Sequence, residues 1–231
     1  MNYYIRMTQK QAIFSLLGGR VQINRGIYNP TSDAVWLAAF ATANVRTVLD
    51  VGIGTGGAAL CLMAHNPNAS VSGVDTSQQM LTECAANAEL NNRAIELINT
   101  DITTWRTDRT FDLVITNPPY FQGTPAKHNA HHNADITQWT RAALRRVKPR
   151  GRFCTIVDAA CVGDVIAALN EVCGDITIFP LFGAKKTAER VLVGARKGVK
   201  GGTTLHAGLP MNYEPVLRDG LTIADALARL I

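Results

Sequence analysis

Short apolar runs alternate with helix-like segments along most of this chain, and that alternation constrains the fold more than any other feature. A short apolar run that ends in glycine or polar residues predicts a buried strand. Strands that alternate with helices form βαβ units, which build a parallel sheet covered by helices on both faces. The predicted strands are residues 47–51, 70–75, 95–99, 111–116 and 151–157, and the predicted helices are residues 57–65, 77–92, 136–147 and 164–172.

The two ends of this pattern differ from its centre. Two further strands, residues 176–179 and 191–195, follow each other without an intervening helix, so we expect them to pair as an antiparallel hairpin. Near the N-terminus an apolar helix is predicted over residues 34–43, for which Ser32 and Asp33 are candidate caps.

Length and composition favour one globular domain. Hydrophobic residues make up 47% of the 231 residues and charged residues 18%, so a sizeable core can form. We expect a single α/β domain over residues 1–231. Its parts are an N-terminal segment (1–45), a core (46–196) and a polar tail (197–231).

The cysteines and the N-terminus bear on the compartment. The chain has five cysteines and no CxxC pair, and most of them lie in apolar surroundings, which is typical of a reducing compartment. The first residues lack the apolar core of a signal peptide, and no run is long enough to span a bilayer. These features predict a cytoplasmic protein with no membrane partner.

The first predicted strand runs directly into the glycine-rich turn Gly52-Ile53-Gly54-Thr55-Gly56-Gly57. Glycines there allow a tight turn and let a ligand lie against the backbone at a helix N-terminus. Asp75 closes the next strand, where a carboxylate can accept both hydroxyls of a ribose. Asp101 follows the third strand, where a loop carboxylate could reach an adenine amino group. The turn therefore predicts a nucleoside-containing ligand.

Two kinds of cofactor suit such a turn. Gly52, Gly54 and Gly57 also satisfy the GxGxxG pattern of dinucleotide-binding proteins. Asp50, two residues before the first glycine, would repel a pyrophosphate but could hold the ammonium group of a methionine. It favours S-adenosylmethionine, which carries no phosphate, over a nicotinamide cofactor.

The fourth strand ends in the tetrapeptide Asn117-Pro118-Pro119-Tyr120. Two prolines remove backbone donors and hold the chain extended, so the Asn117 side-chain oxygen and the Pro118 carbonyl can accept the two hydrogens of one amino group. Tyr120 can stack on a planar substrate. We therefore interpret all four residues as a catalytic motif that orients an amine for methylation.

At this point the chain resembles class I methyltransferases. The combination of LDVGIGTG, GVD, TDI and FDLVITNPPYF, with similar segments over nearly the whole chain, resembles bacterial adenine-N6 methyltransferases that modify the anticodon loop of a valine tRNA. The resemblance implies a Rossmann-like, class I S-adenosylmethionine-dependent fold: a seven-stranded, mostly parallel sheet with an antiparallel last strand and helices on both faces.

The same resemblance implies positions for the cofactor. The methionine end would lie against Asp50 and the glycine turn, the ribose on Asp75, and the adenine at Asp101, with the N-terminal segment closing over the cofactor. The residues expected to contact S-adenosylmethionine are Thr31, Asp33, Asp50, Gly52, Gly54, Gly56, Asp75, Asp101, Ile102 and Asn117. No metal is expected, although histidines cluster at His128, His131 and His132.

The net charge of +5 and the pI of about 9.1 favour a polyanionic partner, which the resemblance identifies as tRNA. Candidate phosphate contacts are Lys127, Arg141, Arg145, Arg146, Lys148, Arg150, Arg152, Lys185, Lys186, Arg190, Arg196, Lys197 and Lys200. The tryptophans at 36, 105 and 139 are interpreted as packing residues.

Other functions remain open. The tetrapeptide also suits a methyltransferase for glutamine side chains of release factors, which needs an N-terminal helical domain that the residues before the first strand are too few to form. Further alternatives are guanine N2 methylation of RNA, a nicotinamide-dependent oxidoreductase and a non-catalytic RNA-binding protein.

Overall fold

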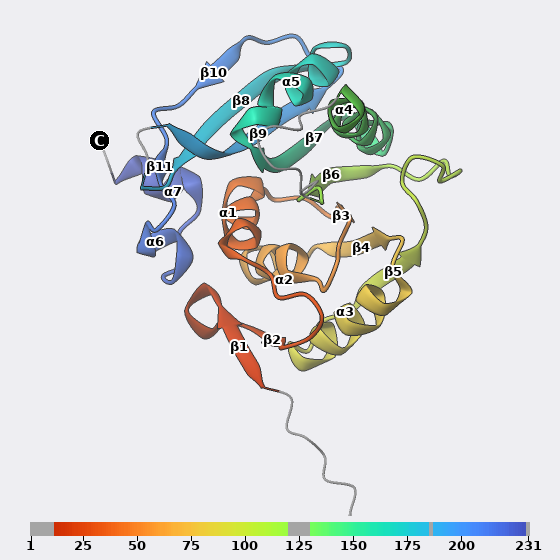
Figure 1. Cartoon of the computed structure of the whole chain (residues 1–231), viewed down its shortest axis with the longest axis vertical. Helices are drawn as coiled ribbons and strands as arrows, with labels where there is room; N and C mark the ends of the chain where they lie inside the picture. The colour runs from red at the N-terminus through yellow and green to blue at the C-terminus, as the bar shows by residue number, and fades with distance from the viewer. Residues whose placement is uncertain (1–11, 120–129, 185–186, 230–231) are drawn as a thin grey trace, which may run out of the picture.

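The computed structural model describes residues 12–119, 130–184 and 187–229 as a sheet with helices on both faces (Figure 1). The strands are β1 (Ile13–Leu16), β2 (Val21–Asn24), β3 (Thr47–Val51), β4 (Ser70–Asp75), β5 (Ile95–Asn99), β6 (Phe111–Thr116), β7 (Val147–Asp158), β8 (Cys173–Phe182), β9 (Ala188–Lys197), β10 (Thr203–Leu205) and β11 (Leu209–Pro210). The helices are α1 (Ser32–Ala41), α2 (Gly57–His65), α3 (Gln78–Leu90), α4 (Ala130–Arg145), α5 (Val162–Asn170), α6 (Glu214–Leu217) and α7 (Ile223–Ala228).

The main sheet has the strand order β10-β8-β9-β7-β6-β3-β4-β5, with β11 also paired to β8. Strands β5, β4, β3, β6 and β7 are all parallel, whereas β9 is antiparallel to both β7 and β8. All seven strands predicted from residue 47 to residue 195 are present, and the antiparallel hairpin of β8 and β9 is confirmed. The fold is that of the class I S-adenosylmethionine-dependent methyltransferases.

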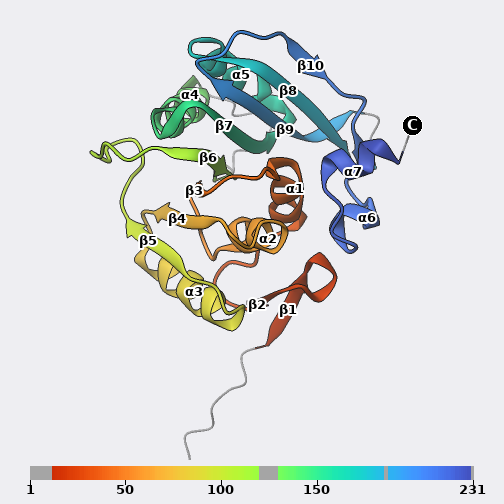
Figure 2. The same ribbon diagram turned by 180° about the vertical axis from the view of Figure 1, so that it is seen from behind.

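Alternating side chains divide the core into two layers. In β6, Leu113 and Ile115 face one layer with α1, α2 and α3, while Val114 faces the other layer with α4 and α5. This is the period-two pattern of a strand that is buried on both faces. Figures 1 and 2 show the two groups of helices on opposite sides of the sheet.

The caps explain where two helices begin. Ser77 is the N-cap of α3, because its hydroxyl accepts a hydrogen bond from the Met80 amide. Helix α1 begins earlier than predicted: Thr31, rather than Ser32 or Asp33, is its N-cap and accepts from the Asp33 amide.

The C-terminal residues do not form a separate polar tail. Strands β10 and β11 extend the sheet beyond the seven predicted strands. The indole nitrogen of Trp36 donates to the carbonyl of Met211 over 3.1 Å, and Val216, Ile223 and Ala226 are buried in the same layer as α1. The last segment of the chain therefore covers α1 and completes the core. None of the helices in the described ranges combines the length and the apolar character needed to cross a membrane.

Candidate active site

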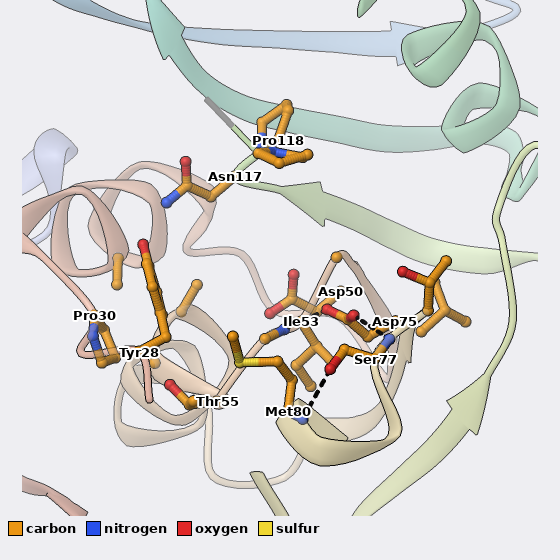
Figure 3. A pocket seen from close by; sticks show the side chains of 18 of the residues that line it. Tyr28, Pro30, Asp50, Ile53, Thr55, Asp75, Ser77, Met80, Asn117 and Pro118 are labelled. Carbon is orange, nitrogen blue, oxygen red and sulfur yellow. Dashed lines mark hydrogen bonds between the residues drawn. The ribbon is translucent and has the colours of Figure 1, made fainter. Parts of the chain in front are cut away.

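A cavity of about 440 Å³ opens at the carboxyl ends of the parallel strands β3, β4 and β6. Open parallel sheets bind ligands at this edge, and the volume lies in the range of small-molecule sites. Many of the residues that line the cavity were predicted from the sequence: Thr31, Asp50, Gly52, Gly54, Asp75, Ile102, Asn117, Pro118 and Pro119. Figure 3 labels Asp50, Asp75, Asn117 and Pro118 among them.

The glycine turn forms one wall of the cavity. Gly54 has a φ of +54°, which favours glycine, and a Cβ there would point into open space. Gly56 has a φ of +89° and caps α2, but it does not line the cavity; a Cβ there would lie 2.8 Å from the Cys84 sulfur on α3. Gly54 thus leaves room for a ligand, whereas Gly56 allows helix packing.

Asp75 connects the end of β4 to the glycine turn. One carboxylate oxygen accepts a hydrogen bond from the Gly54 amide and the other from the Ser77 amide, both over 2.9 Å. Each oxygen retains a lone pair, and the side chain lines the cavity. The contact with a ribose stays a prediction, and these bonds show that Asp75 also holds the turn in shape.

Asp50 is a buried carboxylate at the end of β3. Its Oδ2 has no hydrogen-bond partner among the described residues. Burial, and then the neighbouring Asp75, raise the pKa of Asp50 to about 7, against the lowering effect of a hydrogen bond from the Ala59 amide. A buried carboxylate oxygen without a partner suits a cationic ligand group, because a cation would offset its desolvation.

Besides Gly56, two predicted cofactor residues do not line the cavity. Asp101 is exposed and caps a local turn, where Oδ1 accepts from the amide and hydroxyl of Thr103. Its neighbours Thr100 and Ile102 line the cavity instead. The loop thus presents a backbone and an apolar side chain to the ligand rather than the carboxylate.

Asp33 is the second of these residues. It is buried in the first turn of α1 and forms an ion pair with Arg190 over 3.2 Å. Arg190 also contacts Asp158 at the end of β7 over 3.2 Å. Asp33 therefore joins α1 to β7 and β9, while Thr31, two residues earlier, faces the cavity.

Asn117 follows the last residue of β6, and its Oδ1 is buried without a hydrogen-bond partner among the described residues. It lines the cavity together with Pro118 and Pro119, and Figure 3 shows it across the cavity from Asp50 and Asp75. Tyr120 lies outside the described residues.

Two aromatic residues line the cavity that the sequence reasoning did not assign to it: Tyr28 and Trp139. The Trp139 indole donates to the Thr116 hydroxyl over 3.0 Å, and that hydroxyl donates to the Val51 carbonyl over 2.8 Å. Helix α4 is thereby attached to the ends of β6 and β3. The sequence offers one signal that Trp139 lines the cavity, which is its place on the helix that follows β6. For Tyr28 the signal is its position three residues before Thr31.

Two of the basic residues near the start of β7, Arg146 and Lys148, have internal partners. Arg146 is 8% exposed, donates to the carbonyls of Thr107 and Trp105 and lies over the Trp105 ring. Lys148 forms an ion pair with Asp112 over 2.8 Å. Both therefore serve the fold, and reversing their charges would disturb it. Lys127, Lys185 and Lys186 lie outside the described residues.

No group of metal-binding side chains is found within the described ranges. His128 lies outside them, and the side chains of His131 and His132 are not described.

Comparisons with known proteins identify similarity to several methyltransferases. A family model described as the methyltransferase small domain matches residues 31–179. A tRNA1(Val) (adenine(37)-N6)-methyltransferase from Glaesserella parasuis is 29% identical over 54% of this chain and 57% of its own length. A release factor glutamine methyltransferase from Caulobacter vibrioides is 32% identical over 52% of this chain and 46% of its own length. The chain thus spans about half the length of these curated relatives.

Among solved structures, a predicted O-methyltransferase from Agrobacterium tumefaciens is 26% identical, with a TM-score of 0.65. The match covers 78% of this chain and 88% of that one.

Proposed function

The chain belongs to the methyltransferase small domain family, and on this premise we propose that it transfers a methyl group from S-adenosylmethionine to N6 of an adenine in tRNA. The observation that carries the proposal is the Asn117 oxygen, which is buried, lacks a partner among the described residues and lines the same cavity as Asp50 and Asp75. An acceptor for an amine and an acceptor for a cationic cofactor thus meet in one cavity.

The residues of the cavity suit S-adenosylmethionine, which supplies an electrophilic methyl group. Asp50 would hold the methionine ammonium through its unpartnered oxygen, and Asp75 the ribose hydroxyls. Gly54 leaves space against its backbone, and Ile102 offers an apolar surface to the adenine. Ionised Asp50 would repel a pyrophosphate, which disfavours a nicotinamide dinucleotide.

Asn117 and the prolines orient the acceptor. The Asn117 oxygen and the Pro118 carbonyl would each accept one hydrogen of the amino group, which directs the nitrogen lone pair toward the methyl group. The amine loses a proton easily once it is methylated, so no strong base is required. Catalysis then rests on orientation and on fixed dipoles that cost no reorganisation during the reaction.

Several observations support adenine in tRNA over the other acceptors. The excess of positive charge favours a polyanion, and a relative that is similar over half of the chain carries the name of a tRNA adenine methyltransferase. An unpaired loop base costs little to rotate into a pocket. A tRNA substrate also implies activity in the cytoplasm. A relative named as a glutamine methyltransferase makes release factors the second candidate acceptor.

The test is a methyl-transfer assay with labelled S-adenosylmethionine and either unmodified tRNA or a release factor. The RNA is digested, and the methylated nucleoside is identified by mass spectrometry. We expect N6-methyladenosine. Label found only in protein glutamine, or on N2 of guanine, would overturn the adenine assignment and leave methyl transfer standing. Label in neither substrate would favour a non-catalytic RNA-binding protein.

A further inference from the structure

Tyr28 is a large aromatic side chain that faces the cavity from the connection between β2 and α1. It is 41% exposed and lines the cavity together with Asn117 and Pro118. In Figure 3 its hydroxyl points toward the end of the cavity where Asn117 lies. None of the hydrogen bonds among the described residues uses this hydroxyl, so the polar end of the side chain is available to a ligand.

The backbone on both sides of Tyr28 is held in place. The Asn24 amide donates to Asn87 of α3 over 2.9 Å, and the Ile27 amide donates to Glu83 of α3 over 3.2 Å. On the other side Pro30 packs so closely against α2 that a Cβ on Gly57 would lie 2.5 Å from it. The ring therefore projects from a fixed position.

Asn87 links this connection to the glycine turn, because its side-chain nitrogen Nδ2 also donates to the carbonyl of Thr55 over 2.9 Å. The backbone that precedes Tyr28 is thus tied to the glycine turn. Burial and the nearby charge of Asp33 raise the pKa of the Tyr28 hydroxyl, which keeps the group protonated and able both to donate and to accept.

We propose that Tyr28 is a specificity-determining residue that stacks on the acceptor base and hydrogen-bonds to its edge. The proposal rests on the proposed function and extends it, because it explains how a planar base would be preferred over a flexible amide. An aromatic ring stacks on any base, whereas the small carboxamide of glutamine gains little from such a face. The ring would hold the base while Asn117 and Pro118 hold its amino group.

The experiment compares the wild type with Tyr28→Ala and Tyr28→Phe, with Ile27→Ala as the matched control. Ile27 is the adjacent residue, is 54% exposed and does not line the cavity. Steady-state kinetics give kcat and KM for tRNA, and calorimetry gives the Kd for S-adenosylmethionine. We expect Tyr28→Ala to raise the KM for tRNA about 10-fold or more, the loss of one stacked base. Tyr28→Phe should retain most of the affinity, and Ile27→Ala all of it.

The Kd for S-adenosylmethionine distinguishes a role of Tyr28 in stacking on the base from a role in lining the cofactor site. The Kd for S-adenosylmethionine should change by less than about twofold in both Tyr28 variants, a change equivalent to well under 1 kcal/mol. A rise in that Kd with an unchanged KM for tRNA would show that Tyr28 serves the cofactor and would overturn the proposal. Unchanged kinetics in Tyr28→Ala would overturn it as well.

A second measurement does not depend on methyl transfer. An anticodon-loop RNA that carries the fluorescent base 2-aminopurine at position 37, the position named for the Glaesserella relative, is titrated with protein and S-adenosylhomocysteine. Stacking quenches the fluorescence, so we expect strong quenching by the wild type and Tyr28→Phe and weak quenching by Tyr28→Ala. Equal fluorescence in wild type and Tyr28→Ala would refute the role of Tyr28. A wild type that quenches the base but methylates no tRNA would instead contradict the proposed function alone.

Discussion

Among single residues, we expect Asn117 to decide the rate of the proposed methyl transfer. Its buried oxygen has no partner among the described residues, so a substrate amino group would find a preorganised acceptor. Replacing Asn117 with alanine removes one of the two acceptors, and activity should fall by about 10²–10³-fold. The measurement is the single-turnover rate with labelled cofactor. The Kd for S-adenosylmethionine should barely change, and full activity in the variant would contradict the mechanism.

Asp50 should make cofactor binding depend on pH. Its pKa of about 7 means that the carboxylate is largely protonated below neutrality, and a protonated acid cannot pair with an ammonium group. We expect the affinity for S-adenosylmethionine to weaken about tenfold for each pH unit below 7, as for any single group that must ionise on binding. Calorimetry over the range from about pH 5.5 to 8 measures it. Asp50→Asn should bind more weakly and with a flat profile.

The same carboxylate should affect stability when no ligand is bound. The pKa in the folded chain is about 7, above the ordinary value of 3.8, so the folded state binds the proton more tightly. This contribution to stability is complete below about pH 4 and is lost as the pH rises through 7. Denaturant unfolding of the wild type should show this decline, and Asp50→Asn should show less of it. A smaller fall in stability over this window in Asp50→Asn than in the wild type would agree with the assignment, whereas identical slopes would contradict it.

At the scale of secondary-structure elements, the C-terminal helices belong to the core. Ile223 at the start of α7 is 5% exposed and packs in the layer of α1, whereas Leu205 on β10 is 69% exposed. Ile223→Ala should lower the free energy of unfolding by about 2–4 kcal/mol, because it removes buried methyl groups and leaves a cavity. Leu205→Ala is the control from the same segment and should change it by less than about 0.5 kcal/mol. Equal effects in urea titrations would show that α7 does not contribute to the core.

At the scale of the whole molecule, the net charge of +5 should make tRNA binding depend on salt. Basic side chains displace counterions from phosphates, so the logarithm of the affinity should fall linearly with the logarithm of the salt concentration. Arg150, near the start of β7, lies at the edge of the sheet opposite the cavity. Lys185 and Lys186 come between the end of β8 and the start of β9, and β8 ends at the cavity edge.

Filter binding at several salt concentrations tests which edge contacts the RNA. Charge reversal at Lys185 and Lys186 should weaken tRNA binding and reduce the salt slope, whereas Arg150→Glu should leave both nearly unchanged. An affinity that does not depend on salt would refute a polyanionic partner. A larger effect of Arg150→Glu than of the lysine variants would place the RNA on the opposite edge.

The sequence by itself determined the order of strands and helices, the glycine turn and the position of Asn117 at the end of β6. These features are local: side-chain periodicity reports burial within an element, and glycines and prolines restrict the backbone where they stand. The sequence also placed Asp50 and Asp75 at one edge of the sheet, because the carboxyl ends of parallel strands lie at the same edge.

Only the tertiary structure decided which side chains reach the cavity. Tyr28 lines it because α3 holds the backbone that precedes it, and Trp139 because α4 is attached to the ends of β6 and β3. Asp101 is exposed and bonds to its own turn. Arg146 is buried and donates to the backbone carbonyls of Thr107 and Trp105. Strands β10 and β11 join the sheet because β8 has a free edge. Each outcome depends on partners far away in the chain, and the spacing of residues along a sequence carries no record of such contacts.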